Sequence, residues 1–335
     1  MGSAVLKTEP MRIAILLPCY NEAAAIGGVV REFRAVLPAA TIYVYDNNSS
    51  DDTMAVARAA GAVVRGEPLQ GKGNVVRRMF ADIEADIYVM ADGDGTYHAP
   101  SAIPMIRRLV EDNLDMVVGT RLHSEVDGAF RAGHQFGNRM LTGFVGWLFG
   151  NRFQDMLSGY RVFSRRFAKS FPALSQGFET ETELAVHALE LRMPVAEVST
   201  PYGARPEGSQ SKLRTYRDGF RILMTILMLF KEERPLGFFS LVFAALFGLA
   251  SLLGGPLVVE WLETGLVPRF PTAILATGVM ILAFLSLSSG FVLDTVTLGR
   301  REMKRMAYLS IPGPSPVPQP AETVSVSAPA DPALV

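Results

Sequence analysis

Two long runs without a charged residue lie near the C-terminus and strongly constrain how this chain can fold. PLGFFSLVFAALFGLASLLGGPLVV lies between Arg234 and Glu260, and FPTAILATGVMILAFLSLSSGFVL lies between Arg269 and Asp294. A helix rises about 1.5 Å per residue, so either run could cross the roughly 30 Å hydrocarbon layer of a membrane. Buried core helices are the alternative, but charge-free runs of this length are uncommon in soluble folds. We therefore predict a two-helix transmembrane hairpin, with spans of about 236–259 and 271–294.

The cations around the two runs predict the orientation of the hairpin. Lys231 and Arg234 precede the first run, Arg269 is the one cation of the connection, and four cations follow the second run: Arg300, Arg301, Lys304 and Arg305. The positive-inside rule therefore places both flanks in the cytoplasm. We expect a multi-pass protein of the cytoplasmic membrane with its N-terminal domain and C-terminus in the cytoplasm. The hairpin could also support a homo-oligomer.

Short β-rich runs alternate with helical runs from residue 11 onward. RIAILLP, TIYVYD, AVVRG, DIYVMAD and LDMVVGTR are typical of strands, and helical patterns such as EAAAIGGVVREFRAVL separate them. This succession predicts an α/β domain with a mostly parallel sheet and helices on both faces. We expect that domain over 11–233, a basic juxtamembrane helix over 295–309, and disorder over 1–10 and in the Pro-rich tail 310–335. FGNRMLTGFVGWLFG and YRDGFRILMTILMLF suit membrane-surface helices as well as core helices.

The composition excludes several classes of protein. The formal net charge is -1, so nothing favours nucleic acid as a partner. Cys19 is the single cysteine, which excludes a disulfide framework and a thiolate zinc site, and its position suits a small apolar residue at a strand end. The first ten residues lack the apolar core of a secretory signal. The four histidines show no ligand spacing and are interpreted as structural.

Polar clusters follow the predicted strands at the point where each strand ends. PCYNE follows the first strand, DNNSSDDT the second, DGDGT the fourth and GTR the fifth. Ligands of open parallel sheets bind beyond the carboxyl ends of the strands, where these clusters would meet. The sequence therefore predicts a ligand site at this edge.

Asp92 and Asp94 are the strongest candidates within that site. They flank Gly93 directly after a buried strand, and glycines beside them would let the backbone approach a diphosphate. Carboxylate oxygens suit Mg²⁺ or Mn²⁺, which could bridge the protein and the phosphates. Turn formation is the alternative interpretation of these residues.

Two further strand-end segments offer candidates with simpler alternatives. Asp46 could accept hydrogen bonds from a ribose or a base, whereas Asp51 and Asp52 are expected to cap the next helix. GEPLQGKGN is not a phosphate-binding P-loop, because Gly73 stands where that motif requires Ser or Thr. Lys72 could still reach a phosphate of the ligand.

Cations also recur at the ends of elements. If they converge near a membrane they would form a clamp for an anionic lipid head group, and otherwise they are solvated surface cations. The candidates are Arg121, Arg131, Arg161, Arg205 and Lys212.

An ordered set of motifs now resembles a known family. PCYNEAAAI, YDNNSSDDT, DGDGT, VVGTR, DMLSGYRVF and GSQSKL, over roughly 11–233, resemble the family 2 glycosyltransferases of the GT-A fold. Within that family they are similar to the branch of dolichol-phosphate mannose synthase and bacterial polyprenyl-phosphate glycosyltransferases. The resemblance implies a Rossmann-like sheet and inverting, metal-dependent transfer of a sugar from a nucleotide-diphosphate sugar to undecaprenyl or dolichyl phosphate. We expect a UDP-sugar, with GDP-mannose possible, and Mg²⁺ or Mn²⁺ as the cofactor.

The resemblance also implies roles for individual residues. The donor would be bound by Pro18, Tyr20, Glu22, Asp46, Asn48, Lys72 and Asp92. Asp92 and Asp94 would hold the metal, Asp155 and Arg161 would lie at the transfer site, and the acceptor phosphate would face Arg121, Arg131, Arg205, Ser211 and Lys212.

Two departures from the family refine this hypothesis. The mannose synthases usually carry Gln as a further metal ligand where this chain has Thr96, so the third protein ligand stays open. The QxxRW motif of processive members is absent, since Trp147 and Trp261 are the only tryptophans. Transfer of a single sugar is therefore expected.

The predicted acceptor explains a sparse active site. A phosphate monoester has its second pKa near 6, so it is largely dianionic at pH 7 and needs no strong base. Asp155 is therefore expected to position groups, whereas a hydroxyl acceptor would require Asp155 or Glu179 to take a proton. The alternatives are a glycosyltransferase acting on a lipid hydroxyl, a nucleotidyltransferase and a non-catalytic membrane adaptor. PCYNEAAAIGG lacks the basic loop that a nucleotidyltransferase would need.

Overall fold

A computed structural model describes residues 11–121, 143–147, 153–174, 177, 179–203, 224 and 227–314. The predicted disordered N-terminus and most of the predicted tail lie outside these residues. So does most of the region expected to hold membrane-surface helices.

A seven-stranded sheet forms the centre of the described N-terminal domain, in the order β3-β2-β1-β4-β6-β5-β7. Its strands are β1 (Ile13–Cys19), β2 (Thr41–Asp46), β3 (Val63–Gly66), β4 (Ile87–Met90), β5 (Met116–Arg121), β6 (Arg161–Ser164) and β7 (Val195–Thr200). Every pairing is parallel except those of β6, which runs antiparallel to β4 and β5. The prediction of a mostly parallel sheet is confirmed.

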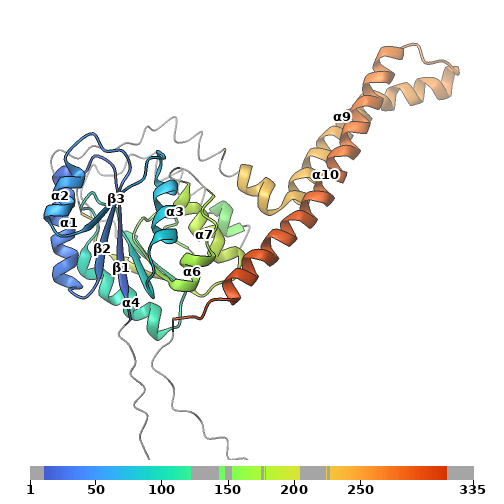
Figure 1. The fold of residues 1–335 in the computed structure, drawn as a ribbon. Coiled ribbons are helices and arrows are strands. Elements are labelled where there is room, and N and C mark those ends of the chain that lie inside the picture. Colours follow the sequence, from blue (N-terminus) through green and yellow to red (C-terminus); the bar gives the residue numbers. More distant parts are fainter. Residues whose placement is uncertain are drawn as a thin grey trace, which may run out of the picture.

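Two layers of helices cover the sheet (Figure 1). One face carries α1 (Ala23–Val36), α2 (Thr53–Ala59) and, after the short η1 turn (Ala99–Ser101), α4 (Ala102–Glu111). The other face carries α3 (Lys72–Asp82), α6 (Arg165–Ser170) and α7 (Thr180–Glu190). Side chains alternate along a strand, so Ile15 and Leu17 pack under the first layer while Ala14 and Leu16 pack under the second.

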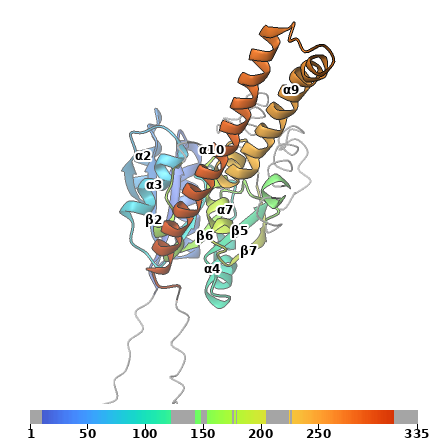
Figure 2. The ribbon, with the colours of Figure 1, turned by 90° about the vertical axis from the view of Figure 1, so that its right-hand side faces the viewer.

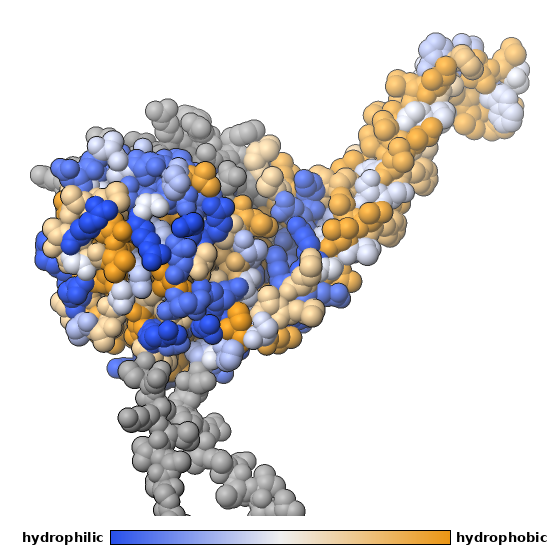
Figure 3. Space-filling view, in the orientation of Figure 1, coloured by the Kyte–Doolittle hydropathy of each residue, from blue (hydrophilic) through white to orange (hydrophobic). Residues whose placement is uncertain are grey.

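Two long helices project from this domain as a hairpin: α9 (Pro235–Thr264) and α10 (Phe270–Leu309). Both are long and apolar enough to cross a membrane, and only 6% and 11% of their most hydrophobic windows are buried. A soluble protein rarely exposes so much contiguous apolar surface, so the hairpin is unlike a pair of core helices. Figure 3 shows this apolar surface along the projecting helices. The predicted spans lie within α9 and α10.

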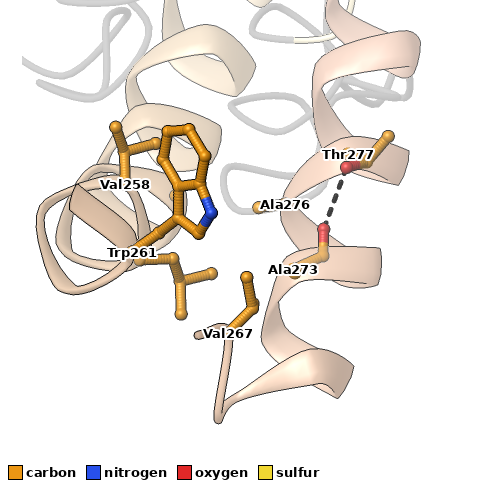
Figure 4. Close-up of a pocket in the computed structure, with 8 residues that line it drawn as sticks. Val258, Trp261, Val267, Ala273, Ala276 and Thr277 are labelled. Atoms are coloured by element: carbon orange, nitrogen blue, oxygen red, sulfur yellow. Dashed lines mark hydrogen bonds between the residues drawn. The ribbon is translucent and has the colours of Figure 1, made fainter. Parts of the chain in front are cut away.

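Small residues allow the two helices to pack closely. The buried positions of α10 recur every seven residues at Ala276, Ala283, Gly290 and Thr297. A Cβ on Gly290 would come within 2.9 Å of the Cβ of Phe239 on α9. Such a heptad pattern of small residues is typical of tightly packed helix pairs in membranes. Towards the outer end, Trp261 of α9 faces the small residues Ala273 and Ala276 of α10 (Figure 4).

The predicted juxtamembrane helix is the C-terminal part of α10, which continues without a break to Leu309. Its last turns contact the domain through polar side chains. Lys304 pairs with Glu190 at 2.6 Å, and the Tyr308 hydroxyl donates to Asp115 Oδ2 at 2.8 Å. Figure 2 shows α10 passing along the domain to its lower end. Lys304, one of the cations that suggested the membrane orientation, therefore also attaches the hairpin to the domain.

Candidate active site

The carboxyl ends of the parallel strands form one edge of the sheet. Because β6 is antiparallel, its first residue, Arg161, also lies at this edge, and the loop that precedes it carries Asp155. The sheet topology thus brings the predicted clusters after β1, β2, β4 and β5 together with the DMLSGYR segment.

Asp46 closes β2 and is 4% exposed. Its Oδ2 accepts a hydrogen bond from the backbone N–H of Ser49 at 3.0 Å, whereas Oδ1 is buried and receives none from the described residues. Buried polar atoms normally have a partner, so an unpaired carboxylate oxygen at a ligand-binding edge suits a ligand that donates a hydroxyl or an N–H.

Side chains of the surrounding loops hold this region together. The Asn47 amide donates to the carbonyls of Glu67 and Leu69, and its Oδ1 accepts from the N–H of Gly71. Sequence reasoning missed Asn47, although two asparagines after a strand were a visible signal. Asn48, expected to bind the donor, lies in the left-handed region at φ 65° and donates to the carbonyl of Pro68.

The two residues predicted to cap α2, Asp51 and Asp52, differ in their hydrogen bonds. Asp51 accepts from the N–H groups of Thr53 and Ala23, so it joins the beginnings of α1 and α2. Asp52 occupies the N-cap position of α2, but its side chain makes no capping hydrogen bond, contrary to expectation.

The remaining residues expected to bind the nucleotide lie at the end of β1. Pro18 is half-buried, Tyr20 is exposed and Glu22 is buried at the beginning of α1. All three lie near Cys19 in the chain, which pairs with Asp46 in the sheet, so they border the same edge as Asp46.

Asp92 and Asp94 directly follow β4. Asp94 is buried, and its Oδ1 accepts from the N–H of Thr96 at 3.1 Å and from the Thr96 hydroxyl at 2.7 Å. Thr96 therefore supports Asp94 in this structure. No cluster of three or more His, Cys, Asp or Glu residues suited to a metal occurs within the described ranges.

The neighbouring glycines are required by close packing. A Cβ on Gly93 would collide with Cys19 Sγ, and one on Gly159 would lie 2.7 Å from Asp92 Oδ2. Gly95 has φ 75°, a left-handed conformation that glycine adopts freely. Gly93 thus packs against the interior, and Gly159 lets the DMLSGYR loop approach Asp92.

Lys72 begins α3 and lies between two carboxylates. Its Nζ is 2.5 Å from Asp92 Oδ1 and 2.5 Å from Glu181 Oε1. Burial by itself would lower the pKa of Lys72, but the two carboxylates outweigh burial and raise it above its ordinary value. Sequence reasoning missed Glu181 and selected its neighbour Glu179 instead.

Asp155 is held by Arg121. Arg121 Nε and Nη2 each donate to one oxygen of Asp155 at 2.7 Å, and Glu197 of β7 accepts from the N–H groups of Gln154 and Asp155. Burial would raise the pKa of Asp155, but the Arg121 hydrogen bonds lower it below its ordinary value. Asp155 is thus a poor proton acceptor, and Arg121 is already paired.

Arg161 differs from the expectation that it acts at the transfer site. Its side chain is 0% exposed, and its guanidinium donates to the backbone carbonyls of Ser158 and Met156. Burial lowers the pKa of Arg161 to about 10. Arg161 therefore holds the DMLSGYR loop in place. Arg131, Arg205, Ser211 and Lys212 lie outside the described residues.

The described histidines have structural contacts, as expected. His98 Nδ1 lies 3.1 Å from the Ser101 hydroxyl, and His187 is buried against Phe167 and Phe171. Cys19 is likewise buried at the end of β1.

Comparisons with known proteins agree with this architecture. The model of the family "Glycosyl transferase family 2" matches residues 14–170. Glycosyltransferase AglJ of Haloferax volcanii is 35% identical over 306 residues, which cover 90% of this chain and 99% of that protein. Dolichyl-phosphate hexose transferase of the same organism is 26% identical over 222 residues, covering 66% of this chain and 95% of that protein.

Among solved structures, the fold is similar to glucosyl-3-phosphoglycerate synthase from Mycobacterium tuberculosis in complex with Mn²⁺, UDP-glucose and phosphoglyceric acid. The TM-score is 0.53 at 23% identity, covering 65% of this chain and 79% of that chain. The sheet, the strand-end clusters and these relatives lead to one conclusion: the chain belongs to the family 2 glycosyltransferases and has a GT-A fold.

Proposed function

We propose that this glycosyltransferase moves one sugar, with inversion, from a nucleotide-diphosphate sugar to a polyprenyl phosphate at the cytoplasmic face of the membrane. A UDP-sugar is the favoured donor. Undecaprenyl or dolichyl phosphate is the acceptor, and Mg²⁺ or Mn²⁺ is the cofactor.

The donor half of the proposal is supported by residues at the ends of β1, β2 and β4. Asp46 presents a buried oxygen that receives no hydrogen bond from the described residues, which suits a base N–H or a ribose hydroxyl. The structural neighbour was solved with UDP-glucose and Mn²⁺, which favours a UDP-sugar here. Lys72 and Asp92 lie next to each other at the position proposed for the diphosphate.

The carboxylates of this edge fit a divalent cation. Mg²⁺ is commonly held by one or two carboxylates with the substrate phosphates, without a complete protein cage. Asp92 and Asp94 supply two such groups, and Thr96 acts by orienting Asp94. A bound cation would neutralise charge that develops on the departing nucleoside diphosphate.

The pairing of Asp155 with Arg121 favours a phosphate acceptor over a hydroxyl acceptor. A hydroxyl acceptor must lose a proton, but Asp155 has a lowered pKa and both its oxygens accept from Arg121. A phosphate monoester is already largely dianionic at pH 7 because its second pKa is near 6. The site therefore suits an acceptor that needs alignment and charge screening more than a base.

The position of the hairpin supports a lipid acceptor. α10 finishes beside Asp115, which precedes β5, so it ends at the edge where the parallel strands begin. The hairpin projects from the opposite end of the domain (Figure 1). The reacting edge would thus face the membrane, where we propose that Arg131, Arg205, Ser211 and Lys212 contribute to holding the lipid phosphate.

Transfer by the purified full-length chain in lipid nanodiscs tests this proposal. Radiolabelled UDP-sugars and GDP-mannose are each offered with undecaprenyl phosphate, dolichyl phosphate or diacylglycerol, with Mn²⁺ or with EDTA. We expect a product with one sugar on a polyprenyl phosphate, from a UDP-sugar, that EDTA abolishes. Label on diacylglycerol alone would instead support a lipid-hydroxyl transferase.

A further inference from the structure

Glu181 lies on the second helix layer, at the beginning of α7, yet its carboxylate reaches Lys72, which also pairs with Asp92. It is 5% exposed, its Oε1 is 2.5 Å from Lys72 Nζ, and its Oε2 is buried without a hydrogen-bond partner among the described residues. A half-satisfied buried carboxylate is costly, so its presence beside the donor site calls for a function.

We propose that Glu181 is a positioning residue that keeps the Lys72 ammonium at the donor diphosphate while Asp92 is engaged with the cation. This inference rests on the proposed function for its donor. It assigns Glu181 no contact with the reacting atoms.

The geometry of the lysine supports this role. An ammonium group has three N–H donors, and Asp92 and Glu181 accept two of them. Among the described residues no other side chain pairs with Lys72, so the third donor could bind a phosphate oxygen. Lysine is long and flexible, so a buried anchor on its ammonium reduces the entropy lost when a phosphate is bound.

The ion pair between Glu181 and Lys72 can also persist when the donor binds. Asp92 belongs to the loop after β4, whereas Glu181 belongs to the first turn of α7, where a helix favours negative charge. Engagement of Asp92 by a cation and a diphosphate therefore leaves the pair between Glu181 and Lys72 intact. Without Glu181, Lys72 would keep Asp92 as its ionic partner among the described residues and would be free to leave the site once Asp92 is engaged.

The net charge of the side chains around Lys72 also favours a pair between Glu181 and Lys72 beside a bound cation. Counted with one charge each, Asp92, Asp94 and Glu181 exceed Lys72 by two negative charges, which a divalent cation would offset before the anionic diphosphate binds. Removal of the Glu181 charge would weaken this balance and also release the ammonium.

Calorimetry of UDP binding with Mn²⁺ tests the proposal on the full-length chain in nanodiscs. The variants are Glu181→Gln, Lys72→Met and the double variant, with Glu183→Gln as the matched control on the same helix. We expect Glu181→Gln and Lys72→Met each to weaken UDP binding about tenfold. The double variant should be no weaker than Lys72→Met, and Glu183→Gln should bind like the wild type.

Two results would overturn the role of Glu181. One is unchanged UDP affinity in Glu181→Gln; the other is a further loss of affinity when Glu181→Gln is added to Lys72→Met. Glu181→Asp keeps the charge and is expected to recover part of the affinity, and thermal melting of each variant separates these effects from misfolding. A kcat loss in Glu181→Gln with unchanged UDP affinity would identify a base instead.

Parallel transfer assays separate this inference from the proposed function. A wild-type chain that binds UDP in a Glu181-dependent manner but glycosylates no polyprenyl phosphate would overturn the proposed acceptor. The role of Glu181 would survive that result.

Discussion

Asp46 and Asp115 are both buried carboxylates of the same sheet, but they lie at opposite edges and have opposite surroundings. Asp115, before β5, accepts from the Ser164 hydroxyl, from two nitrogens of Arg166 and from the Tyr308 hydroxyl of α10. Asp46, at the end of β2, accepts from one backbone N–H through Oδ2, and its Oδ1 lacks a partner among the described residues.

This difference separates a carboxylate that holds the fold together from one that is available to a ligand. A satisfied buried carboxylate is costly to disturb, because its partners lose their acceptor at the same time. An unsatisfied one contributes little to stability and gains its partner on binding. Isosteric substitutions of Asp115 and Asp46 test this difference.

The largest effect is expected on stability, from substitution of Asp115. Asp115→Asn leaves Arg166 without its counter-charge and should destabilise the protein by about 3 kcal/mol. Thermal melting in nanodiscs measures the loss, and Asp112→Asn at the exposed end of α4 is the matched control. Unchanged melting of Asp115→Asn would show that this network adds nothing to the attachment of α10.

Asp94→Asn is expected to have the next largest effect, on activity alone. Asp94 is proposed to hold the cation that offsets charge on the departing diphosphate, so loss of its carboxylate should reduce kcat about a hundredfold or more. The amide oxygen introduced by this substitution can still accept from Thr96, so the melting temperature should stay the same. Full activity of this variant would refute the role of the acidic pair.

Asp46→Asn tests directly whether Asp46 serves a ligand or the fold. We expect UDP binding to weaken about tenfold, because a hydrogen bond to a charged group is lost. The melting temperature should not fall, since the substitution removes a buried charge that lacks a full set of partners. A lower melting temperature with unchanged UDP affinity would show that Asp46 is a structural carboxylate like Asp115.

The smallest expected effect concerns the pH dependence of the pair between Asp155 and Arg121. The folded-state pKa of Asp155 lies below its ordinary value of 3.8, so the pair stabilises the fold above that pH and loses this contribution as pH falls through the folded-state pKa. The melting difference between wild type and Asp155→Asn should therefore be constant from about pH 8 to 5 and shrink below about pH 4. A difference that changes between about pH 5 and 8 would contradict the lowered pKa.

Much of the fold and the general location of the site could be predicted, since both depend on local patterns. Strand-like runs separated by helical ones, with polar residues at each strand end, predicted the parallel sheet and its ligand-binding edge. Asp46 closes its strand, and Asp92 and Asp94 lie just beyond the end of theirs, so their positions were evident from the sequence.

The partners of the site residues could not be predicted in the same way, because they come from distant segments. Lys72 meets Glu181, Arg121 meets Asp155, and Tyr308 meets Asp115 across a separation of 193 residues. Arg161 shows the same limit, since its cluster suggested a catalytic arginine but the fold buries it against backbone carbonyls.

Local patterns were enough to predict the kinds of element, the apolar hairpin and the residues at the strand ends, because hydrophobic periodicity and charge-free length act within one segment. Which charges meet depends on how the layers pack. The fold inserts β6 antiparallel between β4 and β5, and it lays α7 and α10 across the second face. Ion pairs depend on distances between side chains of different elements, and those distances exist only once the layers have packed.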